Sequence, residues 1–253
     1  MKVTLAVVTL VILLGGFLLF KNQQTPTPSA PQTIDQTSKT GYVFGDPKKS
    51  AHYESNTPEH GTTLAGVPIN VVINFNFDLV KPSSIIISPW NEGRESFIDM
   101  GVGETIIDSN KLSMRRKMNT NSFDDLYTVS YKACWSDGSC HDGNFQFAVD
   151  RSLAAGFSDM TGKKEVEIKM SEIKFNPQDL KVSKGTKVNW INDDTVEHYV
   201  NTDSHPGHSY YPGQNSKALG KGESYSVTFD KSGIYPYHCS AHADNMLGNI
   251  LVE

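Results

Sequence analysis

The sequence has little positive charge and no long basic tract. It contains 23 Lys and Arg residues against 28 Asp and Glu residues, which gives a formal net charge of −5 and a pI of about 5.9. Its basic residues are scattered apart from the short run Arg115-Arg116-Lys117. Proteins that bind nucleic acid usually carry a basic patch or stripe. The charge balance therefore argues against nucleic acid as a partner.

Patterns typical of helices are also missing after the first twenty residues. That part of the chain contains no strong amphipathic helix and no short-period repeat. It shows instead short runs rich in β-branched and aromatic residues, separated by turn dipeptides such as Lys81-Pro82 and Asp137-Gly138. Short strands at this spacing are typical of β-sandwiches. We therefore predict an all-β protein.

The predicted strands fall into two sets, and 253 residues are enough for more than one small domain. The first set predicts a sandwich at residues 45–150, and the second predicts another at residues 164–253, with a linker at residues 151–163. The strands of the first set are Ile69–Phe77, Ser84–Ser88, Lys111–Met118, Leu126–Cys134 and Asn144–Val149. The strands of the second set are Glu165–Met170, Leu180–Val182, Thr186–Ile191, Glu197–Asn201, Ser224–Phe229, Ile234–His238 and Asn249–Val252.

One long hydrophobic run opens the chain. Residues Val3–Phe20 are apolar except for two Thr and two Gly, and a lysine stands on each side of the run. Eighteen residues in a helix span roughly 27 Å, close to the hydrocarbon thickness of a bilayer. A cleavage site of the Ala-x-Ala kind does not follow closely. We predict an uncleaved N-terminal transmembrane helix at residues 1–21, with a cleaved secretory signal as the alternative.

A polar segment rich in Gln, Thr, Pro and Ser follows at residues 22–44. Such a segment has too little apolar surface to offset the entropy of ordering the chain. We predict a flexible linker that holds the folded domains away from the membrane. Both interpretations of the first residues imply export, so the folded domains are expected on the extracytoplasmic side, either periplasmic or extracellular.

Cysteine is scarce, with three residues in the chain. Cys134 and Cys140 flank a predicted hairpin tip, and in an oxidising compartment they could form a disulfide. A metal site that includes His141 is the alternative. Cys239 is then the odd cysteine, either a free reactive thiol or a metal ligand.

Cys239 lies in the stretch that is most informative about function. His242 follows it by three residues and Met246 follows His242 by four, in one loop between two predicted strands. Two histidines and one cysteine with a weak axial methionine are typical of a blue-copper electron-transfer site. The second histidine is expected to be His198, at the start of an upstream strand. Zinc, which also accepts Cys and His, and a buried free cysteine without metal are the alternatives.

The residues around this loop resemble the cupredoxin family, the plastocyanin-like blue-copper proteins, over about residues 164–253. The resemblance rests on the runs Ile173–Pro177, Val182–Gly185, Val188–Asn192, Gly233–Cys239 and Met246–Gly248, together with His198. It implies a Greek-key sandwich that holds one type 1 copper, cycling between Cu+ and Cu2+. By this resemblance the ligands are His198, Cys239, His242 and Met246.

The preceding domain resembles the CopC family of periplasmic copper-binding sandwiches, over about residues 51–150. The runs that carry the resemblance are Ala51–Gly61, Val67-Pro68, Leu126–Tyr131, Asp137-Gly138 and Gly143–Phe147. It implies an Ig-like sandwich linked to copper resistance and transfer, and it places the first two positions of a Cu2+ site at His52 and Asp137. A second copper at His52, Asp137 and His141 is one hypothesis, and a degenerate sandwich without metal, used as a spacer or as a surface for a partner, is the alternative. Ser139 stands where the family's Asp-Gly-His motif has its histidine, and His141 is the nearest one.

Another pair of histidines, His205 and His208, lies in a long loop of the second domain. They could bind a second metal or shape a surface for a partner. Loop histidines without a nearby thiolate are more often ordinary surface residues.

These features predict an exported, membrane-tethered copper protein that passes single electrons to a transient redox partner and is not an enzyme. The alternative is copper handling, in which the two domains store copper or pass it between a donor and an acceptor. A multicopper enzyme is a third hypothesis. It would need further histidine clusters, and eight scattered histidines without a His-x-His pair argue against it.

Overall fold

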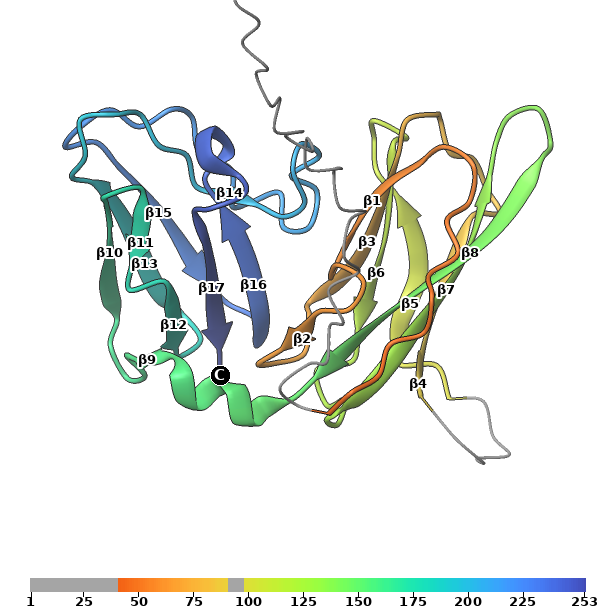
Figure 1. Cartoon of the computed structure of the whole chain (residues 1–253), viewed down its shortest axis with the longest axis horizontal. Coiled ribbons are helices and arrows are strands. Elements are labelled where there is room, and N and C mark those ends of the chain that lie inside the picture. Colours follow the sequence, from red (N-terminus) through yellow and green to blue (C-terminus); the bar gives the residue numbers. More distant parts are fainter. Residues whose placement is uncertain (1–40, 91–97) are drawn as a thin grey trace, which may run out of the picture. The chain divides into compact units, whose positions relative to one another are not determined.

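The computed structural model describes residues 41–90 and 98–253 (Figure 1). The predicted anchor at residues 1–21 and most of the predicted linker at residues 22–44 lie outside the described residues. Within the described part, no helix has the length and apolar character that a membrane span requires. Regular structure there consists of strands and two short 3-10 helices, η1 (Arg151–Gly156) and η2 (Ser240–His242). The all-β prediction is confirmed.

The first domain consists of two four-stranded sheets with the orders β1-β3-β6-β5 and β2-β8-β7-β4 (Figure 1). The strands of one sheet are β1 (Tyr53–Thr57), β3 (Asn70–Phe75), β5 (Gly101–Ile107) and β6 (Ser113–Met118). The strands of the other are β2 (Thr63–Leu64), β4 (Ser84–Pro89), β7 (Asp125–Cys134) and β8 (Cys140–Val149). Neighbouring strands are antiparallel except β2 and β8. Both sheets contribute side chains to one hydrophobic core.

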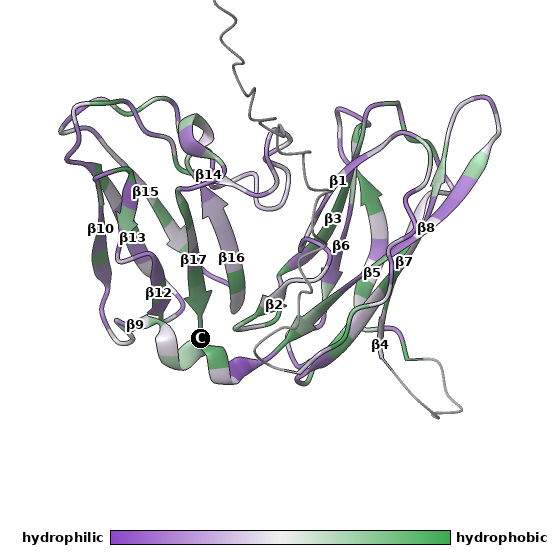
Figure 2. Ribbon diagram, in the orientation of Figure 1, coloured by the Kyte–Doolittle hydropathy of each residue, from purple (hydrophilic) through white to green (hydrophobic). Residues whose placement is uncertain are grey.

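Strand β7 shows why these sheets pack as a sandwich. Tyr127, Val129 and Tyr131 are almost fully buried, whereas Ser130 and Lys132 are exposed. Successive side chains of a strand point to opposite faces, so one face of the sheet joins the core and the other meets water. Hydropathy changes accordingly along the ribbon of such strands (Figure 2).

The second domain also has two sheets, with the orders β11-β10-β13-β15 and β14-β16-β17-β12-β9. The strands of the first sheet are β10 (Glu165–Ser171), β11 (Lys174–Asn176), β13 (Thr186–Asn192) and β15 (Ser224–Phe229). The strands of the second are β9 (Ser158–Asp159), β12 (Asp179–Val182), β14 (Asn201–Thr202), β16 (Gly233–His238) and β17 (Leu247–Val252). Strands β10 and β13 pair in parallel, as do β12 and β17. Parallel pairing requires a crossover, so each pair joins parts of the chain that are far apart in sequence.

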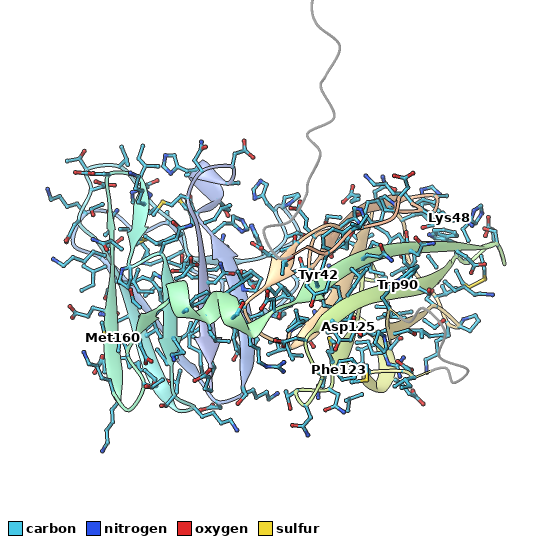
Figure 3. All side chains as sticks on the ribbon, turned by 60° about the horizontal axis from the view of Figure 1, so that its bottom comes forward. Tyr42, Lys48, Trp90, Phe123, Asp125 and Met160 are labelled. Carbon is cyan, nitrogen blue, oxygen red and sulfur yellow. A yellow bond between two sulfur atoms is a disulfide. The ribbon has the colours of Figure 1, made fainter. Side chains whose placement is uncertain are left out.

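Trp190 of β13 lies within the core of the second domain. Its side chain is fully buried, and the rings of Tyr225, Phe229 and Tyr237 lie 6.2, 6.4 and 5.4 Å from it between centroids. These rings come from β15 and β16, which belong to different sheets, so Trp190 connects the two layers. Met160 packs against the same core and is labelled in Figure 3.

Strand β3 is buried on both faces. Val71 and Ile73 belong to the core of the first domain, whereas Val72 belongs to the core of the second. Conversely, Ile234 of β16 and Leu251 of β17, two strands of the second domain, belong to the hydrophobic core of the first domain. A strand covered on both sides needs apolar residues at successive positions rather than at alternate ones. The run Asn-Val-Val-Ile-Asn-Phe of β3 meets this need.

Five strands, β1, β2, β5, β9 and β11, were not among those predicted from hydrophobic pattern, and the longest of them are β1 and β5. Their sequences are Tyr-Glu-Ser-Asn-Thr and Gly-Val-Gly-Glu-Thr-Ile-Ile, and β5 is buried at no position. Both lie at the edges of their sheet. An edge strand can pair through its backbone while its side chains stay polar and exposed. Both edge strands are therefore extended although their sequences show little hydrophobic alternation.

Two segments around the second domain also differ from expectation. The predicted linker at residues 151–163 contains η1 and also β9, which pairs with β12. The strand predicted at Glu197–Asn201 is wrong, because this segment is irregular and β14 begins only at Asn201. The irregular backbone there carries His198.

Candidate metal centres

The loop between β16 and β17 places Cys239 and Met246 next to each other. The Cys239 N–H donates to the Met246 carbonyl at 2.9 Å. The His242 N–H donates to the Cys239 carbonyl, and the Met246 N–H donates to the His242 carbonyl, each at 2.9 Å. The loop is thus closed by its own backbone hydrogen bonds. Cys239 and Met246 are buried, whereas His242 is partly exposed.

His198 reaches this loop from an irregular segment rather than from a strand. Two backbone hydrogen bonds with Leu219 hold it, the His198 N–H donating at 3.1 Å and the Leu219 N–H donating back at 2.9 Å. Asn192, at the end of β13, fixes the turn before it by donating from its side chain to the carbonyls of Val196 and Leu219. The His198 side chain is fully buried.

The structure brings together three of the four predicted ligands. The Cys239 Sγ lies 3.6 Å from the His198 Nδ1 and 3.5 Å from the His242 Nδ1. A sulfur and a nitrogen bound to one tetrahedral metal, at about 2.3 and 2.0–2.1 Å, lie about 3.6 Å apart. Both sulfur–nitrogen pairs therefore already have the separation that a shared metal requires. The Tyr199 N–H points at the Cys239 Sγ from 3.3 Å and stabilises a thiolate there.

Asp194 determines which ring nitrogen of His198 is available to bind a metal. Its Oδ2 lies 2.8 Å from the His198 Nε2. A carboxylate only accepts, so Nε2 carries the proton and Nδ1 keeps a lone pair that faces Cys239. The N–H groups of Ile173 and Glu172 also donate to this carboxylate. The Ile173 backbone and then the His198 side chain hold the pKa of Asp194 down, at about 2.

Replacing Asp194 with alanine is expected to lower the affinity for copper by roughly tenfold to hundredfold, because outer-shell partners of metal-bound histidines have effects of this size. Competition with a chromophoric chelator measures the affinity. Asp193→Ala is the matched control, since this neighbouring carboxylate is 40% exposed and pairs with Lys169 instead. Equal affinities for the two variants would show that Asp194 does not position His198.

Comparison with known proteins decides the family. Residues 162–253 match the family of copper binding proteins described as plastocyanin/azurin, and residues 53–150 match the CopC domain. The plastocyanin of Scenedesmus fuscus is 33% identical over 87 residues, which are 31% of this chain and 86% of the relative. The chain belongs to the plastocyanin/azurin family of copper-binding proteins. Copper is therefore its cofactor.

Two further proteins are similar to part of this chain. Amicyanin-alpha of Methylorubrum extorquens is 29% identical over 110 residues, which are 42% of this chain and 90% of the relative. A solved purple cupredoxin from Nitrosopumilus maritimus is 26% identical, with a TM-score of 0.29, over 35% of this chain and 99% of that one.

Two of the three residues predicted to bind copper in the CopC-like domain lie against one aromatic ring. His52 and His141 contact Trp135, with centroids 5.1 and 5.3 Å from its ring. The Asp137 carboxylate instead accepts from the Ser139 hydroxyl and N–H at 2.7 and 2.9 Å, and these bonds lower its pKa. Among described residues, the groups of three whose ligand atoms lie within 4.8 Å of one another do not include this set. A Cu2+ site at these residues stays a prediction.

Cys134 and Cys140 form a disulfide. They face each other where β7 and β8 pair at the end of the hairpin. Cys239 is then the free cysteine of the chain, and it is buried. Its thiol is therefore available to a metal at the site that Cys239 forms with His198 and His242.

A second cluster of histidines lies close to that site. His205, His208 and His238 have ligand atoms within 4.8 Å of one another. The sequence drew attention to the first two, but His238 read as an ordinary strand residue. Its position directly before a candidate ligand, Cys239, was the available signal. Burial and then the neighbouring histidines lower the pKa of His208 to about 4.

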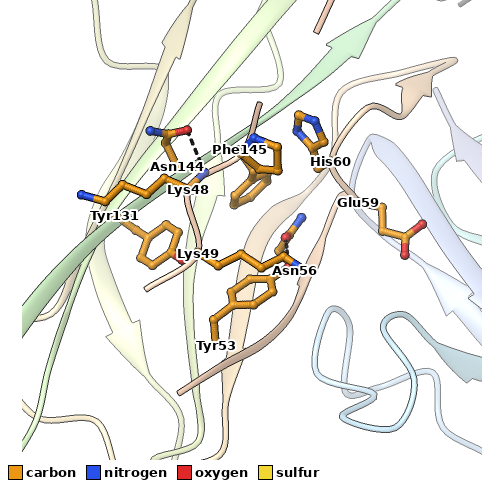
Figure 4. A pocket seen from close by; sticks show the side chains of 10 residues that line it. Lys48, Lys49, Tyr53, Asn56, Glu59, His60, Tyr131, Asn144 and Phe145 are labelled. Carbon is orange, nitrogen blue, oxygen red and sulfur yellow. Dashed lines mark hydrogen bonds between the residues drawn. The ribbon is translucent and has the colours of Figure 1, made fainter. Parts of the chain in front are cut away.

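The CopC-like domain also contains a pocket of about 310 Å³ (Figure 4). Its walls are formed by Pro47, Lys48, Lys49, Tyr53, Asn56, Glu59, His60, Tyr131, Asn144 and Phe145. The Lys48 N–H donates to the Asn144 side chain at 3.4 Å across one side. None of the residues that border this pocket belongs to either histidine cluster of the described chain.

Proposed function

We propose that the C-terminal domain holds one type 1 copper and transfers single electrons. The observation that carries this proposal is the convergence of His198, Cys239 and His242, with ligand atoms within 4.8 Å of one another and two of the three residues buried. Met246, buried and fixed beside Cys239, would add a thioether ligand to the copper. Bound copper supplies a one-electron change between Cu+ and Cu2+.

The protein's contribution is a site whose shape does not depend on the oxidation state. Cys239, His242 and Met246 are fixed by backbone hydrogen bonds within their loop, and His198 is fixed by Leu219 and Asp194. Little rearrangement is then needed when an electron arrives or leaves.

The partly exposed His242 is the edge through which electrons enter. Two large apolar side chains nearby in sequence, Val196 and Leu247, are each 46% exposed. Exposed apolar side chains beside ligand residues in the sequence suit a redox protein that docks transiently through a small interface. No substrate is transformed. We further propose that residues 1–21 anchor the protein and that its domains lie on the extracytoplasmic side.

Copper retention during redox cycling tests this function. Protein loaded with one equivalent of Cu2+ is reduced with ascorbate and reoxidised with ferricyanide in the presence of a Cu+-specific chelator. The visible band is expected to vanish and return over repeated cycles while copper stays bound. Transfer of copper to the chelator at each reduction would contradict electron transfer as the function.

Such release would instead support the second candidate function, copper handling. The match of residues 53–150 to the CopC domain favours it, because two copper-binding families then occur in one chain. In that case copper passes between the domains, or between a donor and an acceptor protein.

A further inference from the structure

The cluster of His205, His208 and His238 has the geometry of a metal site. Ring centroids are 5.4 Å apart for the first pair, 5.5 Å for His205 and His238, and 5.1 Å for His208 and His238. The Nε2 atoms of His208 and His238 are 3.2 Å apart. Two nitrogens bound to one tetrahedral metal at about 2.0–2.1 Å lie about 3.3 Å apart. The observed separation is therefore close to that of two ligands on a common ion.

The hydrogen bond between His238 Nδ1 and Asp203 leaves the Nε2 atom of His238 free to bind a metal. The Asp203 Oδ1 lies 2.8 Å from the His238 Nδ1. Because a carboxylate accepts only, Nδ1 carries the proton and Nε2 has a lone pair directed at His208. A carboxylate behind a histidine is the usual outer-shell arrangement of metal sites. Asp203 thus has the same relation to His238 as Asp194 has to His198.

The loop that presents the other two histidines is held on both sides. The His208 N–H donates to the Ser204 carbonyl at 2.7 Å, and the Asn215 side chain donates to the His208 carbonyl at 3.1 Å. Asn74 of β3 donates to the Ser204 hydroxyl at 2.9 Å and accepts from the Ser209 hydroxyl at 2.7 Å. These bonds reduce the entropy that the loop would lose when it closes around an ion.

We propose that His205, His208 and His238 form a second metal site, which binds a divalent transition ion such as Cu2+ or Zn2+. Neutral imidazole is a good ligand for both ions. Three histidines leave a fourth coordination position, and the exposure of His205 makes this position accessible to water. This site lies next to the proposed copper site of His198, Cys239 and His242, because His238 directly precedes Cys239 in the chain.

Metal titration of the full chain tests the proposal. Protein that already holds one equivalent of Cu2+ is titrated with further Cu2+ and followed by electron paramagnetic resonance and by equilibrium dialysis. The unmodified chain is expected to bind a second equivalent with a spectrum typical of nitrogen ligands. His205→Ala should weaken this second binding by more than about a hundredfold, the upper effect of losing an outer-shell partner.

Asp203→Asn tests whether Asp203 positions the His238 ring. This substitution should weaken binding of the second equivalent of Cu2+ by about tenfold to hundredfold. His205 is exposed, so its replacement is expected to leave the fold and the visible band of the first copper unchanged, which circular dichroism and absorption check. His141→Ala is the discriminating variant, because this exposed histidine belongs to the set predicted to bind a second copper in the CopC-like domain.

Three results would overturn the proposal. They are a chain that binds no second equivalent, a His205→Ala variant that binds it as tightly as the unmodified chain, and loss of the second equivalent in His141→Ala. Repeating the titration with Cys239→Ala separates the two centres, because the histidine site is expected to remain when the first copper is lost. The outcome therefore does not depend on whether the first site is of type 1.

Discussion

Replacing Cys239 with alanine is expected to abolish the intense visible absorption of the copper-loaded protein. That absorption arises from charge transfer between a thiolate and Cu2+, and Cys239 supplies the one free thiol of the chain. Its Sγ lies 3.5–3.6 Å from the Nδ1 atoms of both histidines, so its loss leaves two imidazoles and a thioether. Absorption spectroscopy and electron paramagnetic resonance after addition of one equivalent of Cu2+ measure the effect.

The control is a charge change in the same loop. Asp244 is exposed, and Asp244→Asn is expected to retain the band in full. A colourless unmodified protein, or an equally intense band in Cys239→Ala, would contradict the type 1 site. Loss of the band in both variants would show that the loop itself is sensitive to substitution, and the copper contents of the two proteins would then identify the ligand.

Replacing Trp190 with alanine is expected to lower the free energy of unfolding of the second domain by about 3–5 kcal/mol, the usual cost of truncating a buried large aromatic residue. Trp190 is fully buried, and it contacts rings from both sheets. Neighbours anchored in two sheets have little freedom to collapse into the space left. Urea denaturation of the copper-free protein, followed by circular dichroism, measures the change.

Trp90 provides the matched control, since it is the same residue type with a side chain that is 50% exposed. Trp90→Ala is expected to change the free energy of unfolding by less than about 1 kcal/mol. If both substitutions lowered the free energy of unfolding by a similar amount, burial of the Trp190 side chain would not be the main source of its contribution to stability. The two domains can unfold in separate steps, so each transition is fitted by itself.

The local part of the metal site could be predicted from sequence because its residues are close along the chain. Cys239, His242 and Met246 lie within eight positions, and a hairpin loop of this length brings them together in any sandwich. His198 was a harder case, since it is far away and its predicted strand does not exist. Its identification rested on resemblance, and its actual support comes from Leu219 and Asp194.

His238 shows where the sequence was uninformative. Strand residues alternate between faces, but β16 is buried at nearly every position, so its pattern does not reveal which side chain faces the loop. The partners of His238, Asp203 and His208, follow from the path of a long irregular loop. Turn signals do not determine such a path.

The burial of β3 and the exposure of the edge strand β5 also depend on distant parts of the chain. Continuous burial of β3 results from packing against two cores, which no local pattern of one strand specifies. Exposure of β5 follows from its place at a sheet edge, and that place depends on the pairing of other strands.

The distribution of the proposed copper ligands along the chain has a consequence for the order of assembly. Cys239 and His242 are three residues apart, whereas His198 is 41 residues before Cys239. During folding the hairpin can form early and present a thiolate and one imidazole. Closing the longer loop costs more entropy, and the parallel pairing of β12 with β17 spans a still larger separation. If the site is of type 1, its full ligand set therefore forms only when this longer loop closes, and the colour of a maturing sample would report the time at which His198 reaches the hairpin.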